Sequence, residues 1–320
     1  MIAYLARRIG LAAIVIVLVM IMLAVLVNLV PGDPAKVILG PHATPDLIAQ
    51  VRSNMGLNDP VEVQVWHFIW HALHGDLGTD FISQSSVSSE VWPAFENTLA
   101  LTMFGLVLSV GVGVPLGVLL ATRAGGVLDA AIRSVTMVLL SSPVYVVGLV
   151  LLLILSVHWH VLPALGSGTF SDPVGYGKRL LMPGVALAVF WWAYLARVVR
   201  ASMLEVLGQP YVRTARAYGL TERTVVYGVA LKNALVPVSA LVGLMLGYVL
   251  SGTVYVEIIF NRSGLGSLAL GAVGNRDWPV VRAVVLIYAI AFIVGNLLAD
   301  FGHRLLDPRV RVEEEREVFV

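Results

Sequence analysis

The stretch EVLGQPYVRTARAYGLTERTVVYGVALKNALVP, residues 205–237, lies between two long apolar segments. It is too basic and polar to lie in a bilayer, yet it carries the signals that begin and end helices. Pro210 suits the first turn of a helix, where its missing N–H costs nothing. Gly219 suits the left-handed residue that ends a helix, and Thr221 can cap a second helix that runs toward Asn233. The sequence therefore predicts a helix, a glycine turn and another helix outside the hydrocarbon.

The composition of the whole chain is that of an integral membrane protein. Apolar residues make up 58% and charged residues 13%, and the mean hydropathy is +0.87. These values exclude an ordinary soluble domain. At about 1.5 Å per residue, an apolar helix of about 20 residues crosses a hydrocarbon core of about 30 Å. The segments that reach such a length are 9–30, 98–122, 134–157, 180–199, 235–256 and 280–299.

The distribution of basic residues orients these segments. About two thirds of the 21 Lys and Arg residues fall on the side that holds both termini and the 205–237 stretch. By the positive-inside rule both termini are cytoplasmic. The first segment is longer than the apolar region of a cleaved signal peptide and is read as an uncleaved span. The predicted fold is an all-α polytopic membrane protein with six transmembrane helices.

One sizeable insert separates the first two spans, on the extracytoplasmic side. Helix signals predict a helix over residues 45–55 and another over 60–74, and the serine-rich residues 83–89 predict a loop. The expected division of the chain is 1–30 (cytoplasmic end and first span), 31–97 (small helical extracytoplasmic insert), 98–311 (core with five further spans) and 312–320 (flexible tail).

Residues 205–237 resemble the EAA loop of ABC importer permeases. The pattern of that loop is Glu-Ala-Ala, three residues, Gly and a later Leu-Pro. The aligned residues here are Arg213, Thr214, Ala215, Gly219, Val236 and Pro237, so Arg replaces the Glu. The form YVRTARAYGL followed by KNALVP is similar to the dipeptide/oligopeptide branch of these permeases. A further departure is Gln209 where Asp is common, and it predicts a poorly capped helix start, because Gln is a weak N-cap.

Other pieces of that family's pattern occur in order along the chain, from about residue 3 to residue 311. HGDLGTD resembles the family's GDLGxS segment, and Asn261-Arg262-Ser263-Gly264 stands where a Pro-Gly is common. The matching stretches are VPGDP (30–34), HGDLGTD (74–80), LPALG (162–166), GNRDWP (274–279) and DPRVR (307–311).

The resemblance implies one permease subunit of an ATP-driven importer for di- or oligopeptides in a prokaryotic cell membrane. It implies a second, paralogous permease, two cytoplasmic ATP-binding subunits or domains, an extracytoplasmic peptide-binding protein and surrounding lipid, but no nucleic acid. The chain has no Gly-x-x-x-x-Gly-Lys-Ser/Thr loop, so ATP and Mg are expected in partner subunits, and neither cofactor nor enzymatic activity in this chain. The residues expected to contact the ATPase are Tyr211, Arg213, Thr214, Ala215, Arg216, Gly219 and Leu220.

Polar side chains at mid-span are candidates for the translocation path, although small residues also serve helix packing. They are Ser141, Ser142, Tyr145, Tyr248 and Ser251. Alternatives are a nickel or other small-solute permease of the same family and an ion-coupled secondary transporter. The spans carry no chain of ionisable residues of the kind that proton- or sodium-coupled carriers use. An intramembrane enzyme would need a nucleophile, paired carboxylates or metal ligands there.

Three histidines in the insert share one predicted helical face. His67, His71 and His74 are spaced for one side of a helix, and imidazole suits zinc or nickel. No carboxylate falls at matching spacing, so an exposed polar stripe is favoured over a metal site. The chain has no cysteine, which excludes disulfides and Cys-ligated metals.

Overall fold

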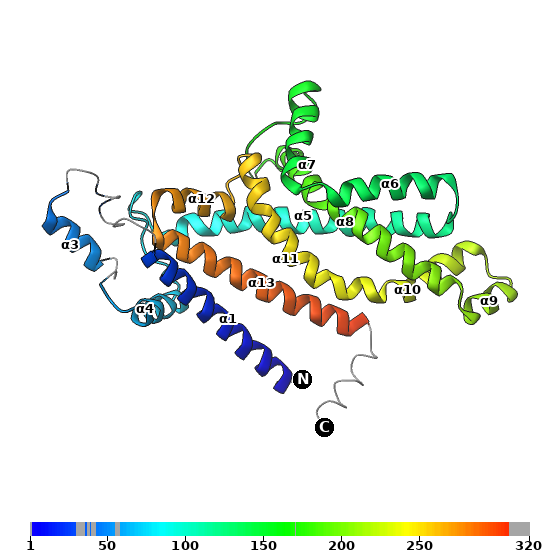
Figure 1. Ribbon diagram of the computed structural model, residues 1–320, viewed down its shortest axis with the longest axis horizontal. Helices are drawn as coiled ribbons and strands as arrows, with labels where there is room; N and C mark the ends of the chain where they lie inside the picture. Colours follow the sequence, from blue (N-terminus) through cyan, green and yellow to red (C-terminus); the bar gives the residue numbers. More distant parts are fainter. Residues whose placement is uncertain are drawn as a thin grey trace. The chain divides into compact units, whose positions relative to one another are not determined.

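A computed structural model describes residues 2–29, 36, 39, 43–54, 58–169 and 171–306. Within these ranges every regular element is a helix, and an isolated antiparallel bridge joins Thr79 and Ser86. The stretches 30–34 and 307–311 and the expected tail 312–320 lie outside the described residues. The elements in Figure 1 are α1 (Ile2–Leu29), α3 (Pro45–Asn54), α4 (Val61–Leu73), α5 (Val87–Thr122), α6 (Val127–Ser141), α7 (Val144–Leu151), the π-helix η1 (Leu152–His158), α8 (Pro173–Leu207), α9 (Pro210–Ala217), the π-helix η2 (Thr224–Ala230), α10 (Leu231–Ala234), α11 (Val236–Ile259), α12 (Leu265–Asn275) and α13 (Trp278–Leu306).

The protein is an all-α polytopic membrane protein. In the described part of the chain, five helices are long and apolar enough to cross a membrane, or six if one bent pair is counted as a span. The five lie within α1, α5, α8, α11 and α13. The two helices predicted in the insert, over 45–55 and 60–74, are confirmed as α3 and α4.

The bent pair corrects the prediction for residues 134–157, which are not one continuous helix. The segments Asp129–Ser141 and Val144–His158 meet at an angle of 106°. Pro143 disfavours the helical conformation of the residue before it, because its ring crowds that residue's backbone. Ser142 accordingly has φ −89° and ψ 117°, an extended conformation, and ends α6. Apolar residues on both sides of Pro143 hide this break from a criterion based on hydropathy alone.

The loop predicted over residues 83–89 is shorter than expected. Helix α5 begins at Val87, so Ser88 and Ser89 already belong to it. The hydroxyls of Ser83 and Ser85 donate to Oε1 of Glu90 in the first turn, at 2.9 and 2.7 Å. These bonds hold the loop against the helix start and let a serine-rich stretch enter a helix.

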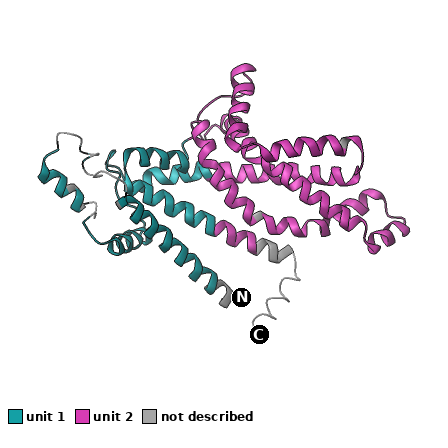
Figure 2. Cartoon of the chain, viewed as in Figure 1, with its two compact units in different colours: residues 1–98, 263–293 teal, residues 99–262, 294–320 magenta. Residues whose placement is uncertain are grey.

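The chain forms two compact units, drawn in different colours in Figure 2. Unit 1 contains residues 1–98 and 263–293, and unit 2 contains residues 99–262 and 294–320. In unit 1, α4 packs against α1. Its buried core draws on residues from both parts of the sequence, namely Met20, Ala24, Val65, Val87, Val91, Leu265, Trp278, Ala283 and Val284.

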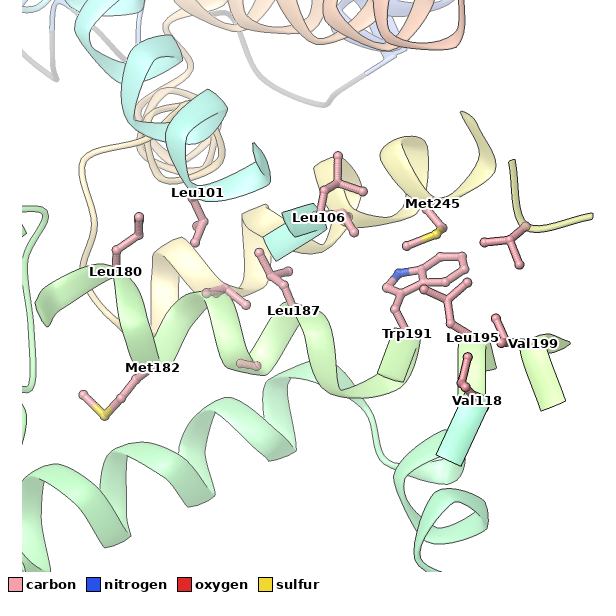
Figure 3. Packing of buried hydrophobic residues seen from close by; sticks show 14 of the residues in the cluster. Leu101, Leu106, Val118, Leu180, Met182, Leu187, Trp191, Leu195, Val199 and Met245 are labelled. Atoms are coloured by element: carbon pink, nitrogen blue, oxygen red, sulfur yellow. The ribbon is translucent and has the colours of Figure 1, made fainter. Parts of the chain in front are cut away.

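Unit 2 is built around α8, which contacts α6, α7, α10, α11 and η2. Figure 3 shows Leu187, Trp191, Leu195 and Val199 of α8 among side chains of α5 and α11. Glycines let α5 approach α8 closely. A Cβ atom added at Gly117 would lie 2.6 Å from Cβ of Val199, and one added at Gly113 would lie 2.8 Å from Cβ of Leu195. The indole N–H of Trp192 donates to the carbonyl of Leu108 at 2.8 Å and ties the same helices together.

Candidate coupling segment, translocation face and carboxyl pair

The first half of the 205–237 segment forms the short helix predicted from its sequence. Helix α9 begins with Pro210 in its first turn, and Gln209 precedes it with no side-chain cap, as expected for a weak N-cap. Gly219 has φ +78°, the left-handed conformation that was predicted. Its N–H donates to the carbonyl of Arg216 at 2.9 Å, and the N–H of Leu220 donates to that of Ala215 at 3.3 Å. These bonds satisfy carbonyls that the end of a helix leaves unpaired.

The second half is also helical, with a π-helical portion that the sequence did not signal. The N–H of Thr224 donates to the hydroxyl of Thr221 at 3.4 Å, which makes Thr221 the predicted cap. From there η2 and α10 run to Ala234. Val225, Val226 and Ala230 are buried on this helix. The turn at Gly219 therefore folds α9 back beside a helix that is itself anchored in unit 2.

Three contacts fix α9 to that helix. The side chain of Val212 is completely buried. The guanidinium of Arg216 donates to the carboxylate of Glu222 through Nε at 3.1 Å and a terminal nitrogen at 2.7 Å. This bond lowers the pKa of Glu222 and raises that of Arg216. The amide of Asn233 donates to the hydroxyl of Tyr211 at 3.2 Å. Arg216, expected at an ATPase contact, is thus engaged within the segment.

The remaining surface of α9 is open. Tyr211, Arg213, Thr214 and Leu220 are exposed and Ala215 is half-buried. Sequence reasoning passed over Tyr218, which is 84% exposed. The spacing in the sequence could have identified Tyr218 as a candidate, because it follows Tyr211 by two helical turns and shares its face. Glu222 was also missed, and its pairing with Arg216 depends on the turn at Gly219.

Two polar contacts connect this segment and its surroundings to α8. The hydroxyl of Ser202 donates to the carbonyl of Ala234 at 3.0 Å, which joins α8 to the end of α10. The guanidinium of Arg200 binds both carboxylate oxygens of Asp129 at 3.0 and 2.9 Å, which joins α8 to the start of α6. The side chain of Asp129 is 1% exposed. Bidentate pairs of this kind are geometrically specific, so this pair fixes the start of α6 against α8.

The predicted path residues lie at two places in unit 2. Ser141, Ser142 and Tyr145 flank the break between α6 and α7, while Tyr248 and Ser251 lie on α11. Helices α7 and α11 are in contact. The rings of Tyr145 and Tyr255 are 6.4 Å apart, and those of Tyr248 and Trp191 are 6.0 Å apart.

Exposure separates the tyrosines of this face from its serines. Tyr145 is 48% exposed, Tyr248 63% and Tyr255, which was missed, 56%. The hydroxyls of Ser141, Ser142 and Ser251 donate to carbonyls of their own helices. The tyrosines are therefore the more available groups. We call Tyr145, Tyr248 and Tyr255 the tyrosine face.

The histidines of α4 do not converge on a metal site in the described part of the chain, where no group of three or more candidate ligands is present. Nδ1 of His74 lies 2.8 Å from the carbonyl of Trp70. No carboxylate falls at helical spacing with these histidines, but one approaches through the turn that follows: Oδ2 of Asp76 lies 3.4 Å from Nδ1 of His71. The turn after α4 brings it there, which helical spacing alone does not predict.

A buried pair of carboxyl groups in unit 1 was not foreseen. Asp80 and Asp277 are 8% and 2% exposed and hydrogen-bonded to one another. The N–H of Phe81 donates to Oδ2 of Asp277 at 3.0 Å, and the N–H groups of Ile82 and Ser83 donate to Oδ1 of Asp80 at 2.6 and 3.1 Å. A hydrogen bond between two carboxyls requires a proton on one of them, so the pair shares a proton. Asp80 stands where the family pattern GDLGxS has Ser.

The proton resides on Asp277. Burial and the neighbouring Asp80 raise the pKa of Asp277 to about 7. Burial alone would raise the pKa of Asp80 as well, but hydrogen bonds from Asp277, Ile82 and Ser83 outweigh it and hold that pKa below its usual range. A carboxyl beside a second carboxyl is expected to behave in this way. The pair joins the loop after Gly78 to the start of α13.

This pair predicts a pH-dependent loop. The shared proton stabilises the folded loop fully below about pH 4, where the open loop is protonated as well. That contribution is lost progressively as the pH rises to about 7, the pKa of Asp277 in the fold, because two adjacent carboxylates repel. One released proton makes the opening of residues 79–86 up to about tenfold more favourable per pH unit. In Asp80→Asn the amide N–H can donate to Asp277 without a shared proton and the second charge is gone, so the dependence weakens to what burial of Asp277 alone produces. Hydrogen exchange of these amides between pH 4.5 and 7, corrected for intrinsic rates, measures it. Equal slopes in the wild type and the variant would contradict the assignment.

The sequence matches known protein families and relatives over nearly its whole length. Residues 113–312 match the family described as "Binding-protein-dependent transport system inner membrane component", and residues 1–102 match the family of its N-terminal part. A "Probable peptide ABC transporter permease protein" of Sinorhizobium fredii is 37% identical over 309 residues, covering 96% of this chain and 99% of the relative. The "Dipeptide transport system permease protein DppB" of Escherichia coli K12 is 33% identical, covering 97% and 99%. The "Glutathione transport system permease protein GsiC" of Salmonella choleraesuis is 36% identical, covering 92% and 94%.

A solved structure shares the fold. The MetNI methionine ABC transporter, in inward-facing conformations, contains a chain that superposes with a TM-score of 0.55 at 20% identity, covering 66% of this chain and 94% of that one. The family match extends over more than half of the sequence, and the relatives align over nearly all of it. The chain therefore belongs to the family of binding-protein-dependent transport system inner membrane components.

Proposed function

We propose that this chain is one of two permease subunits of an ATP-driven importer that carries di- and oligopeptides across the cell membrane. The observation that carries the proposal is the set of relatives aligned over at least 92% of the chain, which are named for transport of peptides, dipeptides and glutathione. The importer would also contain a second permease, two ATP-binding subunits or domains and an extracytoplasmic binding protein. This chain is a permease subunit and not an enzyme, so the energy of ATP would reach it through contacts.

The open surface of α9 is suited to such a contact. Tyr211 and Tyr218 present two aromatic rings on one face, and Arg213 is exposed on another side of the helix. Buried Val212 and the Arg216–Glu222 pair hold the helix in a fixed position on η2. A short helix held in this way moves as a rigid body with a partner that grips it. We infer that an ATPase groove grips this surface.

The movement would then reach the spans through α8. The backbone connection through Gly208 and Gln209 and the Ser202–Ala234 hydrogen bond carry it into α8. The Arg200–Asp129 pair carries it on to α6, which ends at the break before Pro143. The break lies beside Tyr145, one of the three residues of the tyrosine face. Closure of the ATPases would in this way change the position of the tyrosine face.

The tyrosine face fits one half of a path for peptides. Phenol rings present an apolar surface and a hydroxyl that donates and accepts hydrogen bonds, which suits ligands with many different side chains. All three rings are exposed in the isolated chain, so a second permease opposite them would close the path. The binding protein would select the peptide before it arrives.

The test reconstitutes this chain with its second permease, its ATPases and its binding protein. We expect ATP-dependent uptake of labelled di- and tripeptides into proteoliposomes, and no uptake or ATP hydrolysis by this chain alone. Uptake of nickel ions and of free amino acids is measured in the same proteoliposomes as a control for substrate specificity. Gradient-driven uptake by the chain alone would favour a secondary transporter, and uptake of nickel in place of peptides would reassign the substrate within the same family.

A further inference from the structure

Helix α4 is apolar on two faces. Val65 is buried, and Phe68 and Ile69 pack against the core of unit 1. On the other side Val63, Trp66, Trp70 and Leu73 are 38%, 63%, 52% and 77% exposed. Their spacing of three, four and three residues places them in one stripe along the helix. We call these four residues the aromatic stripe. A soluble helix with one face buried presents polar side chains on the other, and α4 does not.

The position of α4 places the aromatic stripe at the depth of the membrane. Val65 and Phe68 border a small cavity together with Met20 and Ala24 of α1. Both of these α1 residues lie within the membrane span Arg7–Val27. At about 1.5 Å per residue, Met20 is about 10 Å from the end of that span. A helix packed there lies beside the outermost part of a transmembrane segment and not beyond it.

The direction of α4 agrees with this position. Figure 1 shows α4 nearly along its own axis, whereas α1, in the same unit, runs across the view. A helix that crosses a span in this way lies roughly in the plane of the membrane. Amphipathic helices in this orientation bury an apolar face at the boundary between lipid headgroups and acyl chains. Tryptophans are enriched at that boundary because their rings are apolar with one polar N–H.

The neighbouring surfaces define which side faces lipid and which faces water. On α1, Met22, Leu26 and Leu29 are 59%, 48% and 71% exposed, so the turns of α1 beside α4 also present apolar side chains to their surroundings. On α4 the edge next to the aromatic stripe carries His67 and His71, which line a cavity of about 520 Å³ with polar side chains around it. These polar groups are Asp59, Gln64, Asp76, Gln84 and Arg282. The helix thus separates an apolar surface from a polar hollow.

We propose that α4 is an interfacial helix whose aromatic stripe lies against the lipid bilayer, with His67 and His71 facing the polar cavity. The occupant of the stripe is lipid and not a protein partner, because α1 holds α4 at the depth of its own span and itself exposes apolar side chains at that depth. The helix would anchor the segment between the first two spans to the membrane surface. This inference holds independently of the transported substrate.

The absence of cysteine from the sequence makes the proposal directly testable. Single cysteines at Trp66→Cys and Trp70→Cys, and at the adjacent controls His67→Cys and His71→Cys, are labelled with a nitroxide. The full chain is then placed in phosphatidylcholine–phosphatidylglycerol bilayers, alone and with its co-expressed partners. Power saturation compares collision with oxygen, which concentrates in lipid, and with a water-soluble nickel chelate.

The expected result is a ratio of oxygen to nickel accessibility that is several-fold higher at 66 and 70 than at 67 and 71. Leu73→Cys keeps both tryptophans and repeats the measurement if either tryptophan variant fails to assemble. Equal nickel accessibility at all positions would put the aromatic stripe in water. Protection of 66, 70 and 73 from both reagents would mean that protein covers it. Either of these outcomes overturns the proposal.

Discussion

Replacement of Gly219 by valine is expected to abolish the stimulation of ATP hydrolysis by loaded binding protein in the assembled transporter, while the chain still inserts. Gly219 has φ +78°, and a Cβ atom added there would meet nothing within 4 Å. The effect therefore comes from the backbone and not from a clash. The left-handed conformation costs an L-residue about 1–2 kcal/mol, and a branched side chain is strained further. That is comparable to the 1–3 kcal/mol by which coupled sites typically influence one another.

The consequence is local because the turn positions the contacts of α9. If residue 219 leaves the left-handed region, the bonds from its N–H to Arg216 and from Leu220 to Ala215 are lost. The Arg216–Glu222 pair, which bridges the turn, is separated as well. Helix α9 then no longer sits at a fixed angle on η2, and movement of the ATPase does not reach α8.

Two variants control this prediction. Gly219→Asn should retain most of the coupling, because Asn tolerates the left-handed region better than other residues that carry a Cβ. Arg213→Ala should have a small effect, since an exposed charge contributes about 1 kcal/mol or less. Substrate-stimulated ATPase activity in the reconstituted complex measures all three. Full stimulation in Gly219→Val would show that this segment does not transmit the ATPase movement.

Replacement of Gly117 by valine is expected to destabilise unit 2 itself and to reduce the yield of folded chain. An added Cβ atom would lie 2.6 Å from Cβ of Val199 and 2.9 Å from the carbonyl oxygen of Ala196. Both are inside the α5–α8 contact, where a backbone oxygen cannot rotate away. The helices must separate, and overpacking of this kind costs about 1–3 kcal/mol and occasionally more. The loss extends to Leu195 and Trp191, which pack in the same cluster.

The matched control lies on the same helix. Gly111→Val introduces the same side chain into α5 at a position where a Cβ atom meets nothing within 4 Å. We therefore expect a normal elution profile and an unchanged midpoint of thermal aggregation for Gly111→Val in detergent. For Gly117→Val we expect a lower midpoint and a smaller monodisperse fraction. If both variants lowered the midpoint and the monodisperse fraction equally, the close approach of α8 to α5 would not be the cause of the destabilisation.

The sequence by itself determined the features that depend on residues within one or two helical turns. Pro210, Gly219 and Thr221 predicted the ends of two helices correctly, because helix caps and left-handed turns are made by the residues that carry them. The apolar segments predicted most of the spans, since every backbone group in lipid must be paired within its own helix. The Ser142–Pro143 break is also local, because it depends on the proline ring and the residue before it.

Only the tertiary structure decided which distant groups meet and which faces are covered. Asp80 and Asp277 share a proton because the loop after Gly78 reaches the start of α13, and neither residue signals the other in the sequence. Residues 61–73 are predicted as a helix, but α1 decides that Val65 is buried while Trp66 and Trp70 remain exposed. Such contacts join residues far apart in the chain, so they follow from packing and not from local preference.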